Sequence, residues 1–157
     1  MNANKKNTGS QITKNKKAFF DYEIVDSWEA GIELCGHETK SIRQWHVNLK
    51  GSYVVVVAWE LFIKNMHISA WKALPNRVSI ETDYERKIFL HKKTILFLTG
   101  KSREAWCSII PLELYFKGSL IKLRVGLAKW KKAHQKKQIL KERTMDREAK
   151  KAMKKFI

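Results

Sequence analysis

Residues 106–128, WCSIIPLELYFKGSLIKLRVGLA, decide the fold class of this chain. They contain two apolar runs, residues 106–116 and 120–128, with Gly118 in the short connection between them. Two such runs around a glycine-containing connection predict a β-hairpin. Pro111 has no N–H group to donate to a sheet, so we expect its strand to lie at an edge or to carry a bulge. This half of the chain is therefore expected to form antiparallel β-structure.

Four further segments are predicted strands. Residues 18–28 alternate apolar and acidic side chains, and residues 32–35 follow a turn or bulge at 30–31. Residues 52–58 form a β-branched run typical of a strand buried on both faces. Residues 60–68 are expected to pair with that run. Six short strands in all favour a small closed antiparallel β-barrel that is OB-fold-like.

Short helices and one loop complete the prediction. Residues 37–43 and 91–100 have helix-compatible patterns, and Gly100 is expected to end the second helix. Residues 72–85 contain Pro75 and little periodicity, so we expect an exposed loop there. The predicted fold class is mainly β, with two or three short helices and a basic C-terminal tail.

The charge of the chain is concentrated at its two ends. The 157 residues carry 32 Lys and Arg against 15 Asp and Glu, a formal net charge of +17. Residues 1–17 hold +5, residues 18–128 only +3, and residues 129–157 hold +9. With 44% hydrophobic residues the chain is not wholly disordered. We therefore expect a basic N-terminal arm, a near-neutral barrel at 18–128 and a basic tail.

Two basic ends favour a polyanionic partner, because each Lys or Arg placed on a phosphate releases condensed counterions. A membrane surface and a nucleic acid both satisfy this condition. Nucleic acid is favoured because the tail lacks the broad Trp and Leu face of an interfacial helix. The longest apolar run, residues 53–59, is too short to span a bilayer, and the N-terminus is not a secretory signal. Cys35 and Cys107 lack metal-ligand spacing and are expected to be small core residues of a reduced, cytoplasmic protein.

No catalytic motif is present. The chain has no phosphate-binding glycine loop, no nucleophile elbow and no HExxH sequence. The five histidines are scattered, so we expect no metal site, and the pairs of carboxylates fit a solvated face better than acid–base catalysis. We expect a protein that is not an enzyme and needs no cofactor.

The tail, residues 129–157, has a helix-forming composition without Gly or Pro. Met145, Ala149, Ala152 and Phe156 would form a narrow apolar seam on such a helix. Because like charges make an isolated helix marginal, we expect the tail to be disordered when free and helical once its charge is neutralised. The alternative is a basic extension that only keeps the protein soluble.

A series of short motifs in register resembles the SmpB family, the SsrA (tmRNA)-binding proteins of bacteria. The motifs span about residues 14–157 and are NKKA with DY from Asn15, EAGI from Glu29, ETKSIR from Glu38, VNL from Val47, NMHI from Asn65, RK and HK from Arg86, PL and LYFK from Pro111, and LAK with KK from Leu127.

The resemblance implies an adaptor for trans-translation, the rescue of stalled ribosomes. In this family the barrel binds the tRNA-like domain of tmRNA, and the tail occupies the vacant mRNA channel and decoding centre, on ribosomal RNA. The implied partners are tmRNA, bound as a 1:1 complex by a monomer, and the ribosome, with no membrane. A general ribosome-associated basic protein without tmRNA specificity is the alternative.

The resemblance also assigns residues. Those expected to contact RNA are Asn15, Lys16, Glu29, Lys40, Arg43, Phe89, His91, Lys92, Lys122, Lys129 and Lys131. Those expected to bind the ribosome through the tail are Lys132, His134, Lys136, Lys137, Lys141 and Arg143. Without the resemblance, the local pattern favours a core position for Phe89. Lys122 would then be an unpaired surface lysine, and Glu29 would be the partner of a nearby lysine.

The chain departs from the family pattern at four places. Gln44 and Trp45 replace an Ala-Gly pair, so the turn there needs another backbone solution. Trp130 replaces a glycine, which removes a hinge and offers a stacking surface. Gln135 replaces an acid, and Tyr84–Glu85 replace a proline and an arginine in the 72–85 loop.

Overall fold

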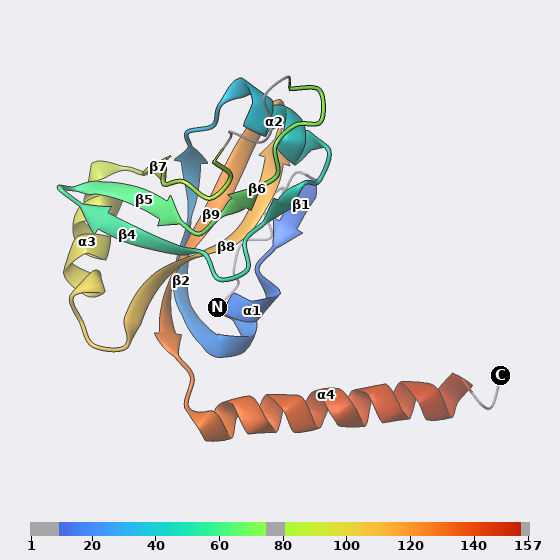
Figure 1. The fold of residues 1–157 in the computed structure, drawn as a ribbon. Coiled ribbons are helices and arrows are strands. Elements are labelled where there is room, and N and C mark those ends of the chain that lie inside the picture. The colour runs from blue at the N-terminus through green and yellow to red at the C-terminus, as the bar shows by residue number, and fades with distance from the viewer. Residues whose placement is uncertain (1–9, 75–80, 155–157) are drawn as a thin grey trace.

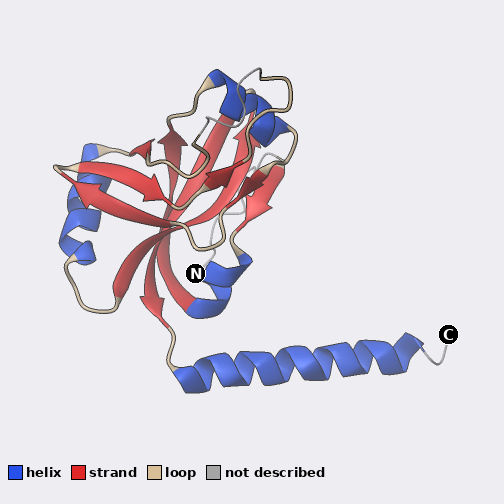
Figure 2. Ribbon diagram, in the orientation of Figure 1, coloured by secondary structure: helices blue, strands red, loops and turns tan. Residues whose placement is uncertain are grey.

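The computed structural model of the chain describes residues 10–74 and 81–154. A seven-stranded antiparallel sheet, a two-stranded sheet and four helices make up this part of the chain (Figures 1 and 2). The elements are β1 Gln11–Lys14, α1 Lys16–Asp21, β2 Tyr22–Ile32, α2 Gly36–Arg43, β3 Val47–Asn48, β4 Tyr53–Val57, β5 Glu60–Lys64, β6 His67–Ile68, β7 Arg86–Phe89, α3 Lys92–Ser102, β8 Cys107–Lys117, β9 Leu120–Trp130 and α4 Ala133–Lys154.

The large sheet closes on itself. Its strand order is β1-β8-β4-β5-β7-β2-β9, and β8 also pairs with β9, so six strands form a ring and β1 is added outside it on β8. This confirms the mainly β prediction. The six strands of the ring are not the six that the sequence predicted, because 18–35 supplies one strand instead of two and β7 takes the remaining place.

The β8–β9 hairpin is the best-predicted part of the fold. Lys117 pairs with Leu120 across a turn in which Gly118 has φ +62°. The register shifts between Pro111 and Glu113, which is the bulge expected at the proline. Gly126 on β9 is required for packing, because a Cβ there would lie 2.8 Å from a methyl carbon of Leu112.

Apolar side chains from every strand of the ring meet in one core. Strand β8 contributes to both of its faces, and its bulge shifts the alternation of side chains: Ile109 and Leu114, five residues apart, both enter the main core, while Ile110 and Leu112 pack outside it with Ala18 of α1. The buried members of the main core are Ile12, Ala30, Ile42, Leu49, Val54, Leu61, Ile63, Met66, Ile68, Ile88, Leu98, Ile109, Leu114, Leu123, Val125 and Leu127.

Several predicted boundaries are wrong. Residues 18–21 belong to α1 because Asn15 caps that helix, its side-chain oxygen accepting a hydrogen bond from the Ala18 N–H at 3.1 Å. Strand β2 continues through Gly31 to Ile32 without a turn. Asn65, with φ +57°, interrupts the predicted 60–68 strand. Gly100 lies inside α3, which ends two residues later.

Burial corrects two further expectations. Strand β4 is not buried on both faces, since Val57 is exposed. Cys35 is exposed at the start of α2 and is not a core residue, whereas Cys107 is partly buried and packs against the edge of the main core. Of the predicted arm, residues 10–17 contribute β1 and the start of α1, and residues 1–9 lie outside the described chain. In the predicted 72–85 loop the described residues form no helix or strand, and 75–80 are not described.

The tail forms one helix, α4, which extends away from the ring (Figure 1). The structure has this helix in the chain alone, which differs from the disorder expected of the free tail, and the predicted formation of helix on the ribosome stays a prediction. Its 22 residues include no Gly or Pro, and its first turn is fastened to the ring through Lys136. No residue of α4 is buried, so the seam residues Met145, Ala149 and Ala152 are exposed, and Phe156 lies outside the described chain. Neither α4 nor any other described helix is long and apolar enough to cross a membrane.

Candidate nucleic-acid interface

One group of predicted residues comes together on the outside of the ring near α2. Strand register places Gly31 of β2 opposite Phe89 of β7 on one side and opposite Lys122 of β9 on the other. A Cβ at position 31 would lie 3.4 Å from the Cβ of Phe89, so the glycine leaves the phenyl ring room to approach β2. Phe89 is 50% exposed, which contradicts its assignment to the core from local pattern.

Glu29 lies beside this row and holds two donors. Its carboxylate accepts hydrogen bonds from the Lys117 ammonium at 2.8 Å and from the Tyr115 hydroxyl at 2.6 Å. The bond from Lys117, followed by the one from Tyr115, lowers the pKa of Glu29 below its ordinary value. Burial and the same carboxylate raise the pKa of Tyr115 to about 12, so its phenol remains a donor. Glu29 is therefore paired with a nearby lysine, as its local reading predicted.

Helix α2 brings two exposed cations to the same end of the ring. Lys40 and Arg43 are three residues apart, so they project from one side of the helix. The Lys40 ammonium lies 4.3 Å from the centre of the Trp71 ring, and Arg43 donates to the backbone oxygen of Ser119 in the β8–β9 turn at 3.5 Å. Both contacts are solvent-exposed and leave the cations accessible to phosphates.

His91 and Lys92 extend the surface at the start of α3. Both are exposed, and only Leu90 separates them from Phe89 in the chain. Together these residues form the α2 surface: Glu29, Lys40, Arg43, Phe89, His91, Lys92 and Lys122.

A buried ion pair supports the α2 surface, and the sequence did not predict it. Glu38 of α2 accepts from the Arg86 guanidinium of β7 at 2.6 Å, and the two side chains are 3% and 1% exposed. Arg86 also donates to the backbone oxygens of Met66 at 2.7 Å and Thr82 at 2.9 Å, and Tyr84 donates to Glu38 at 2.8 Å. This pair joins the helix that carries Lys40 to the strand that carries Phe89. An arginine at the head of an apolar strand was the available signal.

Another group of predicted residues lies at the opposite end of the ring, where β9 leads into α4. Lys129 and Lys132 are exposed there, while Lys131 donates to the Phe19 backbone oxygen at 3.0 Å. Lys136 pairs with Asp21 at 2.9 Å, and its ammonium lies 3.6 Å from the centre of the Trp130 ring. These contacts fasten the start of the tail to α1 and the end of β9.

The remaining tail residues point into solvent. Arg143 has its guanidinium carbon 5.4 Å from the centre of the Phe20 ring, and this side chain is exposed. His134, Lys137 and Lys141 are also exposed on α4.

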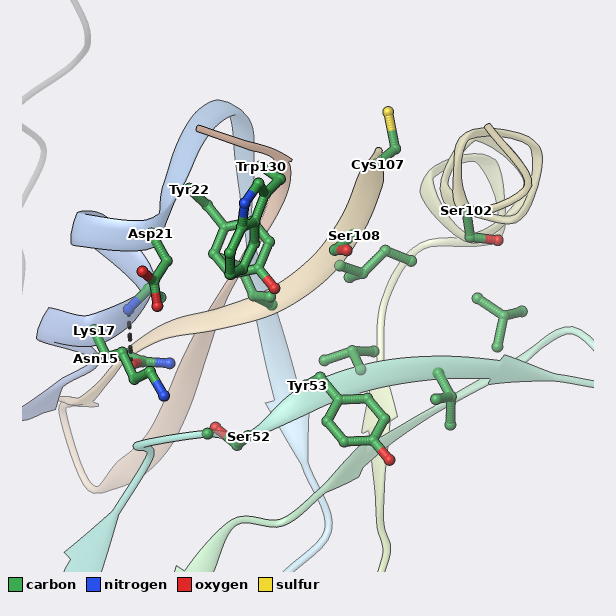
Figure 3. Close-up of a pocket in the computed structure, with 17 residues that line it drawn as sticks. Asn15, Lys17, Asp21, Tyr22, Ser52, Tyr53, Ser102, Cys107, Ser108 and Trp130 are labelled. Carbon is green, nitrogen blue, oxygen red and sulfur yellow. Dashed lines mark hydrogen bonds between the residues drawn. The ribbon is translucent and has the colours of Figure 1, made fainter. Parts of the chain in front are cut away.

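Asn15, predicted to contact RNA, has a buried position in the structure. It is 4% exposed, its amide donates to the Pro111 backbone oxygen at 3.0 Å, and its oxygen caps α1 (Figure 3). The side chain therefore holds α1 against β8. Lys16 is exposed but lies on α1, the helix that contacts α4. A cavity of about 570 Å³ opens beside α1, and Asn15 is the one predicted residue that lines it.

The predicted RNA-binding residues thus divide into two groups. Lys122 and Lys129 are seven residues apart on β9, which corresponds to about 23 Å along a strand. Figure 1 shows α2 at one end of the ring and the root of α4 at the other. Within the described chain no group of three or more His, Cys, Asp or Glu side chains is placed to hold a metal ion.

Comparison with known proteins gives the family. The family model described as "SmpB protein" matches residues 12–155. The chain belongs to the SmpB family. An SsrA-binding protein of Nitratiruptor sp. is 47% identical over 146 residues, which cover 92% of this chain and 97% of that protein. One from Carboxydothermus hydrogenoformans is 44% identical and covers 90% of this chain and 95% of its own length.

A solved SmpB-type structure has a similar fold. It is described as "tmRNA-SmpB: a journey to the center of the bacterial ribosome", has a TM-score of 0.65 and 34% identity, and covers 77% of this chain and 85% of its own.

The departures from the SmpB pattern have visible structural solutions. Trp45 adopts φ +65°, so the turn after α2 keeps a left-handed conformation without glycine. The Gln135 side chain accepts from the Lys132 N–H at 3.0 Å and so caps α4. Tyr84 is held by Glu38, and the pKa of its phenol is raised by burial.

Proposed function

We propose that this chain is the tmRNA-binding adaptor of trans-translation. The ring binds the tRNA-like domain of tmRNA and delivers it to ribosomes that have stalled without a codon, and the tail occupies their vacant mRNA channel and decoding centre. The observation that carries this proposal is the match of nearly the whole chain to proteins named for SsrA binding. The solved relative named for tmRNA and the ribosome supports both partners.

The chemistry of the α2 surface suits a folded RNA. Lys40, Arg43 and Lys92 supply exposed cations for phosphates, which fix the position of an RNA without reading its sequence. Phe89 offers a half-exposed ring on which an unpaired base can stack. A tRNA-like fold presents both phosphates and unstacked loop bases, whereas a plain duplex presents phosphates alone. We therefore expect the surface to discriminate between these two RNAs.

The chemistry of α4 suits a narrow RNA-lined channel. A helix of 22 residues is about 33 Å long, and exposed basic side chains occur along its whole length. It has no buried residue, so it can leave its place beside the ring without opening the core. Release requires that a phosphate replace Asp21 as the partner of Lys136, and that Lys136 and Arg143 give up their contacts with the Trp130 and Phe20 rings.

The direct test compares RNAs of equal length. We expect the purified protein to bind the isolated tRNA-like domain of tmRNA at least about tenfold more tightly than a duplex RNA of the same length at matched salt. Measuring both affinities at several salt concentrations separates the counterion contribution from specific contacts. Equal affinities would favour the alternative, a general ribosome-associated basic protein.

A further inference from the structure

Trp106 is held in a costly conformation at the start of β8. Its φ is +72°, in the left-handed region that a bulky side chain rarely adopts, and 78% of the residue is exposed. Such a backbone conformation costs of the order of 1–3 kcal/mol, persists only where the surrounding structure enforces it, and is enriched at ligand-binding sites. An exposed indole also forgoes the stabilisation that burial of its large apolar surface would supply. The fold therefore gains nothing visible from a tryptophan at this position.

The Trp106 ring borders a basic cleft at the root of the tail. The cleft has a volume of about 540 Å³, within the range of ligand sites, and lies between the end of β9 and the first turn of α4. Its lining residues are Glu23, Trp106, Lys129, Trp130, Lys131, Lys132, Ala133 and Gln135. Three lysines face one acid, so the cleft attracts anions.

The other tryptophan of the cleft is already occupied. Trp130 packs edge-on against Tyr22, with ring centres 4.9 Å apart, and carries the Lys136 ammonium over its ring. Trp130 therefore helps to fasten the tail through Lys136, and Figure 3 shows its ring beside Tyr22. No aromatic or cation–π contact between described residues involves Trp106, and no ion pair among them involves Lys129 or Lys132.

We propose that this cleft is a second RNA-binding site, in which an unpaired base stacks on Trp106 and the adjoining phosphates lie beside Lys129 and Lys132. The inference rests on the proposed RNA-binding function and adds a contact that lies at the end of the ring opposite the α2 surface. A flat π-face beside exposed cations matches the stacking and backbone chemistry by which proteins bind single-stranded RNA. A base inside an A-form duplex cannot reach the indole, so the ligand is a nucleotide in a loop, bulge or single strand.

The test uses the full chain and two glycine variants. Trp106→Gly removes the ring and places at φ +72° the residue that tolerates this conformation best, so its Tm should equal or exceed that of the parent protein. Trp59→Gly is the matched control, because Trp59 has φ +64° and is 61% exposed in the β4–β5 turn, away from the cleft. Trp106→Phe retains an aromatic face.

The first probe is a labelled single-stranded hexanucleotide, compared with its abasic counterpart of identical backbone. Trp106→Gly should weaken binding of the hexanucleotide about 5-fold to 150-fold, the range that stacking of one base on an aromatic side chain gives. Trp106→Phe should weaken it by less than about threefold, and Trp59→Gly should leave it unchanged. The abasic probe should bind the parent protein and Trp106→Gly equally. Equal losses for both probes, or equal losses for both glycine variants, would overturn the proposal.

The second set of probes identifies the source of the nucleotide. Affinities of Trp106→Gly and Trp59→Gly are measured for the isolated tRNA-like domain and for vacant ribosomes. A loss specific to Trp106→Gly on the first probe assigns the nucleotide to tmRNA, and a loss on the second assigns it to ribosomal RNA. If neither affinity falls, the cleft is not an RNA site. That failure is distinct from failure of the proposed function, which would show as equal binding of the tRNA-like domain and a duplex by the parent protein.

Discussion

Glu29 lies on the outside of β2 with its carboxylate held by Lys117 and Tyr115. Both donors lower its pKa below the ordinary value of 4.5, Lys117 contributing most. A carboxyl whose pKa is lower in the folded state stabilises the fold above its unfolded pKa, and this stabilisation is lost as the pH falls through the folded value. Protonation of Glu29 at low pH therefore removes a charge from the α2 surface itself.

We expect Glu29→Gln to reduce the free energy of unfolding at pH 7 by at most about 1 kcal/mol, because the side chain is 38% exposed and its ion pair is screened. The difference between parent and variant should shrink as the pH falls from 7 to about 3, because the parent carboxylate becomes protonated as the pH falls through its lowered folded-state pKa. Urea unfolding at both pH values measures this. A difference that is independent of pH would contradict the assigned ionisation.

Lys40 provides the corresponding test of a cation. Lys40→Glu should weaken binding of the tRNA-like domain about tenfold and reduce the slope of log affinity against log salt by about one, as loss of a phosphate contact requires. Lys50→Glu makes the same charge change at an exposed residue next to Gly51, which lines the α1 cavity on another part of the ring. It should leave the affinity within about threefold of the parent. Equal effects of both variants would mean that Lys40 contributes only to the overall field.

At the scale of elements, the contact between α2 and β7 depends on the buried Glu38–Arg86 pair. Removing one partner leaves the other charge buried without compensation, so Arg86→Met should lower the free energy of unfolding by about 3–5 kcal/mol. Lys87→Met is the matched control on the same strand, because Lys87 pairs with Glu60 in solvent and should cost no more than about 1 kcal/mol. Equal stabilities of the two variants in urea would show that the pair does not join these elements.

Elements fixed by local chemistry were predictable, and those fixed by distant partners were not. The β8–β9 hairpin follows from its own apolar runs and Gly118. Strand β7 was missed because only pairing with β5 and β2 defines it, and polar β1 because it pairs with β8 about a hundred residues away. Helix α1 was assigned to a strand because alternation at 18–24 outweighed the cap at Asn15.

The candidate site shows the same division. Family motifs located the cations of the α2 surface, and the register of β2, β7 and β9 explains why they meet. The arginine at the head of an apolar strand signals a buried partner, but nothing in the sequence identifies that partner as Glu38, 48 positions away. The exposure of Trp106 depends on its left-handed backbone conformation, which nothing in the local sequence of residues 106–108 predicts.

At the scale of the whole molecule, the net charge of +17 resolves into separate surfaces. The near-neutral ring carries a few exposed cations around α2. The tail carries an excess of positive charge along a helix that has no buried residue. Recognition of one folded RNA needs few well-placed contacts, and entry into an RNA-lined channel needs a continuous positive field. The two ends of the ring are therefore suited to separate binding events.

This separation predicts that binding of the tRNA-like domain and action on the ribosome can be lost independently of each other. Deletion of residues 131–157 removes α4 but no residue of either hydrophobic cluster, so the ring should unfold at nearly the same urea concentration as the full chain. The preference for the tRNA-like domain over an equal-length duplex should persist, although both affinities fall with the lost charge. Tagging of nascent chains on stalled ribosomes in a reconstituted system should be abolished. Lys40→Glu in the full chain should show the converse pattern. It should weaken the binding of tmRNA, and a higher tmRNA concentration should restore tagging. Loss of the RNA preference on deletion would mean that the tail takes part in reading tmRNA, and the assignment of one surface to each RNA would be wrong.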